Sequence, residues 1–176
     1  MAKTKSAGVV LTVTARVGKP LANGLRLSLL RAVEMLPHAP AELSVALVGD
    51  AEMSGLHEQF MGITGPTDVL SFELDHDARG RVTSGEIVVC VPEARRQARS
   101  LGHPLTDELL LYALHGVLHL SGYDDKTDSA YRRMHRTEDR ILTQLGVGKV
   151  FSRGSTRQRP KPRLGKLSIH KSRGTV

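Results

Sequence analysis

The chain has 176 residues, with 25 Lys and Arg, 18 Asp and Glu, and a single cysteine. One cysteine excludes an intramolecular disulfide and with it a disulfide-stabilised secreted scaffold, so we expect a cytoplasmic protein. The sequence has no apolar run of membrane-spanning length and no secretory leader, which argues against a membrane protein. The length suits one domain with a core of its own.

Positive charge is concentrated at the C-terminal end of the chain. Residues 149–176 hold nine of the 25 basic residues and no acidic one, which leaves 16 basic and 18 acidic groups, a net charge of −2, in residues 1–148. The same terminal segment lacks periodic apolar residues, so we expect it to be disordered when free. We therefore divide the chain into a folded domain, residues 1–148, and a basic tail, residues 149–176.

Short apolar runs and segments of helical periodicity alternate along the folded domain after a polar leader, residues 1–7, that we also expect to be disordered. Apolar and β-branched runs predict four strands, at residues 9–17, 43–48, 69–74 and 86–91. Capping residues and apolar spacing predict five helices, with starts marked by Asn23, Asp50, Pro92, Thr106 and Asp128 or Ser129. Cys90 lies in an apolar run and is expected to be buried.

The helix predicted from residue 106 carries the candidate chemistry. Thr106 is a suitable N-cap, and the residues after it are apolar on nearly every side, which is typical of a buried helix. His115 and His119 interrupt this apolar surface four residues apart, so both lie on one face. Gly122 favours the left-handed conformation that ends a helix.

The residues after this glycine complete a metal-ligand pattern. His115, His119 and Asp125, with Gly122 reversing the chain, supply two helical ligands and a third ligand after the turn. Three protein ligands with a fourth position open to water are typical of a catalytic zinc site, so we expect one Zn2+ at these three residues. Asp124 either orients a ligand histidine or serves only in the turn. Histidines on an apolar helix are usually core residues, but the combined spacing favours metal binding.

The same spacing also suggests a metalloprotease as an alternative. Metzincin proteases have two helical histidines and a following glycine at these intervals, with a glutamate directly after the first histidine. Here that position is Gly116, so the general base for peptide hydrolysis is missing. The metalloprotease hypothesis is therefore the weaker one.

Three segments resemble the YbeY family. Residues 115–125, HGVLHLSGYDD, are similar to the family signature HGxLHLxGYDH, with Asp125 in place of the last histidine. Residues 66–72, PTDVLSF, and residues 85–89, GEIVV, resemble two further family segments, PTDVLSF and GDIVI. With their spacing, these matches cover most of residues 45–145.

The resemblance implies a metal-dependent endoribonuclease that is specific for single-stranded RNA. Its expected role is rRNA processing during ribosome maturation, at the 3′ end of 16S rRNA, with the ribosome or small-subunit proteins as further partners. His115, His119 and Asp125 would hold the zinc ion, Asp124 would complete the catalytic set, and Ser71 would lie nearby. The implied fold is α+β, a four-stranded mixed sheet packed with helices around a central metal-binding helix, as in zincins.

The chain departs from the family pattern at Met61, where that pattern has an arginine. If the family arginine contacts an RNA phosphate, then this protein either cleaves RNA slowly or uses Arg95, Arg96 or the basic tail to bind the phosphate. Otherwise Met61 only covers the edge of the core. A non-catalytic ribosome-assembly factor with a structural metal is the alternative from another functional class. The sequence leaves the oligomeric state open.

Overall fold

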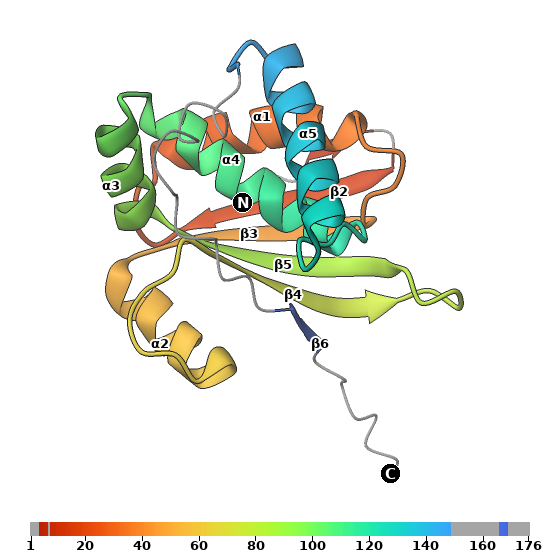
Figure 1. The fold of residues 1–176 in the computed structure, drawn as a ribbon, viewed down its shortest axis with the longest axis horizontal. Helices are drawn as coiled ribbons and strands as arrows, with labels where there is room; N and C mark the ends of the chain where they lie inside the picture. Colours follow the sequence, from red (N-terminus) through yellow and green to blue (C-terminus); the bar gives the residue numbers. More distant parts are fainter. Residues whose placement is uncertain (1–3, 7, 149–165, 169–176) are drawn as a thin grey trace.

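The computed structural model describes residues 4–6, 8–148 and 166–168, with side chains for residues 8–148. One mixed sheet carries helices on both faces (Figure 1). The strands are β1 (Thr4–Ser6), β2 (Val9–Ala15), β3 (Glu42–Val48), β4 (Val69–His76), β5 (Val82–Cys90) and β6 (Lys166–Ser168). The helices are α1 (Leu21–Glu34), α2 (Asp50–Met61), α3 (Val91–Leu101), α4 (Leu105–Leu120) and α5 (Asp128–Gln144).

The strand order is β1-β2-β3-β5-β4-β6. Strands β2, β3 and β5 are parallel, and β4 runs antiparallel to β5. These four are the predicted strands, so the α+β class, the four-stranded mixed sheet and the five helices are confirmed. The zincin-like arrangement around a central metal-binding helix stays a prediction.

Two three-residue strands extend the sheet beyond the predicted four. Strand β1 pairs antiparallel with β2, and β6 pairs parallel with β4. They lie in the leader and the basic tail, both predicted to be disordered, and that prediction is wrong for these six residues. Such short strands depend on backbone hydrogen bonds to a neighbour and have no side-chain pattern of their own. Residues 1–3, 7, 149–165 and 169–176 lie outside the described part of the chain.

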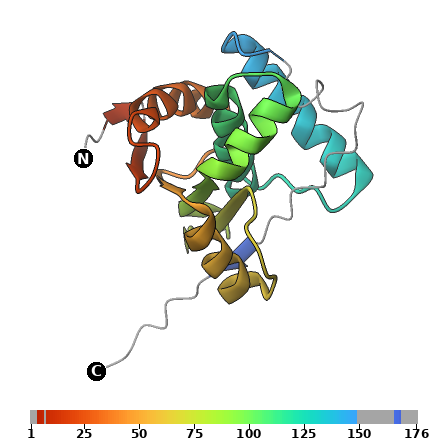
Figure 2. The same cartoon turned by 90° about the vertical axis from the view of Figure 1, so that its left-hand side faces the viewer.

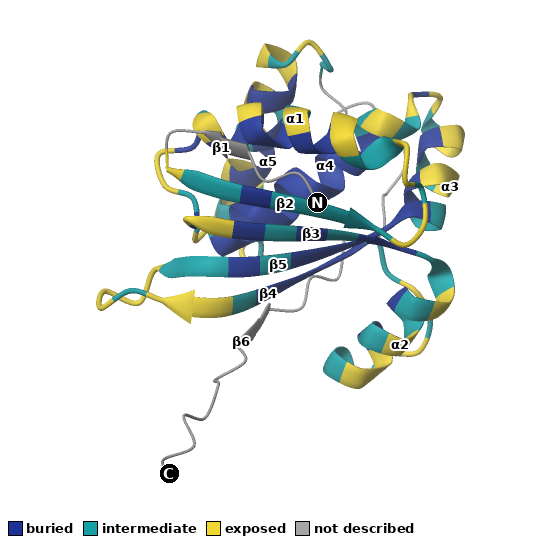
Figure 3. Cartoon of the chain, turned by 180° about the vertical axis from the view of Figure 1, so that it is seen from behind, coloured by how far each residue is buried: buried dark blue, intermediate teal, exposed yellow. Residues whose placement is uncertain are grey.

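Side chains alternate between two cores on the two faces of the sheet. The larger core packs β2, β3 and β5 against α1, α4 and α5, and α4 is buried from Glu108 to Leu120 (Figure 3). The smaller core lies on the face that α2 covers, and there Cys90 is fully buried, as predicted. Met61 packs at the edge of the smaller core, in agreement with the simpler of its two interpretations. Among the described helices, none combines the length and apolar composition that a membrane span needs.

The observed N-caps of four helices lie one to three residues before the predicted ones. The observed N-caps are Pro20, Gly49, Pro104 and Thr127. Proline presets a φ angle close to the helical value and is favoured at helix starts, so it replaces a side-chain cap in α1 and α4. Thr127 does cap α5, because its side chain accepts a hydrogen bond from the backbone N–H of Ala130 at 3.2 Å.

Two glycines bring α4 into close contact with β5. A Cβ atom on Gly116 would lie 2.8 Å from Cγ2 of Ile87, and one on Gly85 would lie 2.6 Å from Cδ1 of Leu120. Side chains at either position would push the helix off the sheet. Position 116 therefore faces the strand, and a glutamate there would enter the core. This packing gives a structural reason for the missing protease base.

The contact between Gly116 and Ile87 predicts that alanine at position 116 destabilises the protein, whereas alanine at an open helical glycine stabilises it. Gly116→Ala should lower the free energy of unfolding by about 1–3 kcal/mol, because the methyl group overpacks against the fully buried Ile87. Gly55→Ala is the matched control, since Gly55 is helical and has open space around its Cβ position. It should raise the free energy of unfolding by roughly 0.5–1 kcal/mol. Urea denaturation measures both values, and a stabilising Gly116→Ala would contradict the proposed packing.

Candidate metal centre

His115 and His119 lie side by side in the last two turns of α4. Their Nε2 atoms are 3.2 Å apart, and their rings meet edge to face with centroids 4.8 Å apart. The two residues are only 4% and 3% exposed. The helical spacing thus brings both imidazoles together in a buried environment. They lie on a different face of α4 from Gly116, which contacts β5.

Asp125 reaches the histidines because the chain turns sharply after α4. Gly122 adopts a φ of +89°, which is the left-handed conformation expected of it. Asp124 then accepts hydrogen bonds at Oδ1 from the backbone N–H groups of Asp125, at 2.8 Å, and Lys126, at 3.3 Å. These bonds favour the second interpretation of Asp124, as a turn residue.

The three predicted ligands converge at a spacing that suits a metal ion. One nitrogen or oxygen atom from each of His115, His119 and Asp125 lies within 4.8 Å of the other two. Zinc–ligand bonds of about 2.0–2.1 Å in a tetrahedron place neighbouring ligand atoms about 3.3 Å apart. The 3.2 Å between the two Nε2 atoms matches this separation, and the carboxylate of Asp125 lies within 4.8 Å of both. The residues present therefore fit a single divalent ion.

A buried carboxylate on α5 orients the first histidine. Glu138 is fully buried, and its Oε1 lies 2.5 Å from Nδ1 of His115. Its other oxygen accepts a hydrogen bond from Nδ1 of His135. Because an ionised carboxylate only accepts hydrogen bonds, Nδ1 of His115 carries a proton. The lone pair of a neutral His115 is then on Nε2, the atom that faces His119.

Charge around His115 favours a cation at this position. Burial by itself lowers the pKa of His115, but the charge and hydrogen bond of Glu138, with smaller contributions from Asp68 and Asp125, raise the pKa overall. Burial likewise opposes ionisation of Glu138, yet His115 and His135 hold the pKa of Glu138 well below its usual range. Three carboxylates thus surround one imidazole, and a metal ion can replace the proton on its Nε2 atom.

His115, His135 and Glu138 form a second group of possible ligands. The contact between His115 and Glu138 has the length of a short hydrogen bond, shorter than the separation of two atoms bound to one ion. We therefore assign this group to the support of His115. Sequence reasoning selected neither His135 nor Glu138 as a site residue.

A signal for Glu138 was nevertheless present in the sequence. Glu138 lies one turn after Met134 and one turn before Ile141, on the apolar stripe of α5. An acidic residue on a buried stripe needs a partner inside the protein, because glutamate is almost never buried unpaired. The signal shows that a partner exists, but it does not identify His115.

Ser71 lies on the face of the sheet that α4 covers. It pairs across the sheet with Ile87, whose side chain meets Gly116, so Ser71 also faces α4. Ser71 is 1% exposed, and its hydroxyl has no hydrogen-bond partner among the described residues. An unsatisfied buried hydroxyl is costly and usually marks a site where a ligand or water binds.

Comparison with known proteins identifies the family. A sequence model of the family described as "Endoribonuclease YbeY" matches residues 21–146. The chain belongs to the YbeY endoribonuclease family. This match confirms the resemblance found in the three sequence segments, and it ends before the basic tail.

Two curated relatives and one solved structure show the extent of the similarity. The endoribonuclease YbeY of Acidothermus cellulolyticus is 43% identical over 117 residues, which cover 60% of this chain and 71% of the relative. The endoribonuclease YbeY of Saccharopolyspora erythraea is 41% identical over 128 residues, covering 68% and 70%. A solution structure of a Thermotoga maritima protein is 27% identical, with a TM-score of 0.55 over 87% of this chain and 99% of that chain.

The geometry predicts that metal binding depends on His119 and not on an exposed histidine. The native protein should retain one equivalent of divalent ion after dialysis, and His119→Ala should lose it, because two remaining ligands rarely hold zinc. His76→Ala is the matched control, since His76 is exposed and hydrogen-bonded to Glu73. Elemental analysis measures the metal content. Full occupancy in His119→Ala would contradict the ligand assignment.

Proposed function

We propose that this protein is a metal-dependent endoribonuclease that hydrolyses single-stranded RNA in rRNA maturation, including the 3′ end of 16S rRNA. The observation that carries the proposal is the convergence of His115, His119 and Asp125 in front of the buried Glu138. Membership of the endoribonuclease family supports the reaction class and the RNA substrate. We infer a cytoplasmic location, with ribosomal RNA and the small subunit as partners.

In this proposal, His115, His119 and Asp125 hold one Zn2+. A zinc ion bound there supplies Lewis acidity toward water and toward an ester phosphate. Glu138 keeps the proton of His115 on Nδ1 and so leaves Nε2 free as a ligand. The Ser71 hydroxyl can donate a hydrogen bond to an anionic oxygen of the substrate, because no described residue accepts it. The buried surroundings exclude bulk water and strengthen each of these interactions.

The two alternatives make different predictions about the same site. A metalloprotease needs a base next to His115, and the contact between Gly116 and Ile87 leaves no room for one. A non-catalytic assembly factor needs the metal only for stability, so its metal content would be unrelated to RNA hydrolysis. The decisive measurement is therefore the hydrolysis of RNA as a function of bound metal.

Cleavage of RNA should require both single-stranded substrate and metal. The native protein should cleave a single-stranded oligonucleotide and spare the same sequence in a duplex, and chelation should abolish cleavage until Zn2+ is restored. His119→Ala should be inactive under all these conditions, whereas His76→Ala should retain native activity. Gel analysis of end-labelled RNA measures the products. Cleavage that persists in chelator would exclude a metal-dependent mechanism, and no cleavage with full metal would favour the assembly factor.

Glu138→Gln tests the orienting carboxylate without creating a cavity. The amide is similar in size, but it lacks the charge that holds His115, so metal affinity should fall by about 10–100-fold. Glu58→Gln, on the exposed surface of α2, removes the same charge elsewhere and should leave the affinity unchanged. Calorimetric titration with Zn2+ measures both affinities. Equal affinities in Glu138→Gln and the native protein would show that the carboxylate only stabilises the fold.

A further inference from the structure

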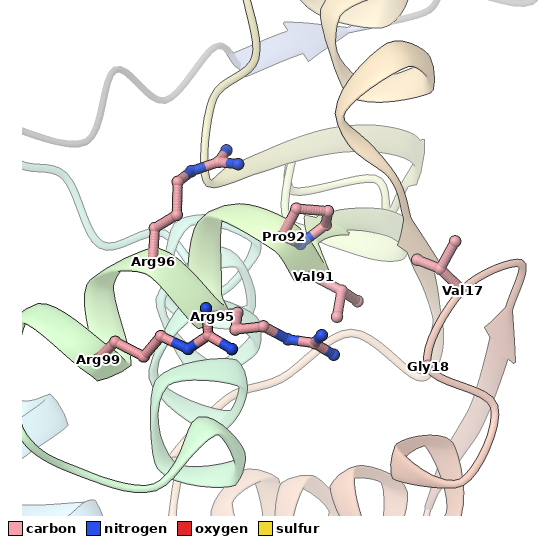
Figure 4. A pocket seen from close by; sticks show the side chains of 7 residues that line it. All are labelled: Val17, Gly18, Val91, Pro92, Arg95, Arg96 and Arg99. Carbon is pink, nitrogen blue, oxygen red and sulfur yellow. The ribbon is translucent and has the colours of Figure 1, made fainter.

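A cavity of about 330 Å³ lies where α3 begins, next to the loop between β2 and α1. Val17 and Gly18 of this loop form one side, and α3 provides Val91, Pro92, Arg95, Arg96 and Arg99 (Figure 4). Three arginines and no acidic residue line the cavity among the described residues. We propose that this arginine pocket binds a phosphate of single-stranded RNA, away from the metal centre. The identity of the ligand rests on the proposed function.

The three arginines differ in their availability. Arg96 is held by two hydrogen bonds to Asp50, at 2.7 and 2.9 Å, and by one to Glu93 at 2.8 Å. Arg95 and Arg99 are exposed and form no hydrogen bond or ion pair with another described residue. Figure 4 shows them extending in the same direction along α3, toward the side of Gly18, whereas Arg96 turns away. Of the predicted substitutes for a phosphate-binding arginine, Arg96 is therefore already engaged.

Arg95 and Arg99 are one helical turn apart, so their guanidinium groups repel each other. Like charges at this spacing destabilise a helix by a few tenths of a kcal/mol. A phosphate between the two forks removes this repulsion and gains charge-assisted hydrogen bonds from both. The arrangement thus favours a dianionic or bridging anionic group over a neutral ligand.

The backbone around the cavity adds to its positive potential. Val91 and Pro92 begin α3, so the part of the cavity that they line lies at the positive end of the helix dipole. Gly18 has a φ of +69°, and a Cβ atom there would lie 3.5 Å from Cγ1 of Val91, the first residue of α3. The glycine lets the loop run close to α3 and keeps the cavity wall on that side low and apolar.

General basicity of the protein does not explain this pocket. Residues 1–148 carry a net charge of −2, so the arginines gather on a slightly acidic domain. The pocket also lies apart from the metal centre: α3 packs beside the first half of α4, and the histidines lie in the second half (Figures 1 and 2).

RNA binding under chelation tests the pocket separately from catalysis. Arg95→Gln with Arg99→Gln in the full chain should weaken binding of a long single-stranded oligonucleotide by about tenfold, as expected for the loss of charge-assisted hydrogen bonds. The slope of log affinity against log salt should fall by about 0.7 for each lost phosphate contact. Fluorescence anisotropy in chelator measures both quantities, and thermal unfolding confirms that the variant folds.

The control removes the same charge from other parts of the surface. Arg31→Gln with Arg79→Gln changes two exposed arginines on α1 and in the β4–β5 turn, and it should leave the affinity and the slope close to native. Equal losses in the two double variants would overturn the pocket in favour of an effect of net charge, and unchanged binding in Arg95→Gln/Arg99→Gln would overturn it directly. The experiment measures binding and not cleavage. It can therefore be interpreted even if the protein does not hydrolyse RNA.

Discussion

The close contact between α4 and β5 holds the candidate metal centre in position. Gly116 and Gly85 remove side chains at the two places where helix and strand approach most closely. The helix can then lie against the sheet, and the side that carries His115 and His119 is directed toward α5. The same contact leaves no room for a base at position 116, because that position points into the core.

Burial of the histidines makes a partner for them necessary. A charge in the protein interior is costly unless it is paired and hydrogen-bonded. Glu138 meets this requirement by accepting hydrogen bonds from both His115 and His135. The network compensates for the buried carboxylate and also fixes the orientation of the His115 ring, a candidate metal ligand. One set of contacts therefore serves both stability and function.

Charges of opposite sign gather at two separate places in the fold. Carboxylates lie around the histidines at the C-terminal end of α4, where a cation is expected, and arginines line the cavity beside α3. The proposed function needs both kinds of site, because a metal-dependent nuclease attracts a cation and a polyanion. Keeping the two kinds of site apart limits the neutralisation of these carboxylates by the arginines.

The sequence by itself determined the features that depend on neighbouring residues. His115 and His119 share a face because helical spacing is local, and Gly122 turns the chain toward Asp125 for the same reason. The four central strands and five helices also followed from local patterns. The helix starts were less accurate, because Pro20 and Pro104 took the place of the side-chain caps that the sequence offered.

Only the tertiary structure decided which distant residues meet at the site. Glu138 is 23 residues from His115, and Ser71 faces α4 through its register with Ile87. Contacts across the fold also decide the strand order and the pairing of the edge strands β1 and β6. They likewise decide that Gly116 faces the sheet. Such contacts are set by packing and hydrogen bonding between separate elements, and neither leaves a periodic pattern in one segment of sequence.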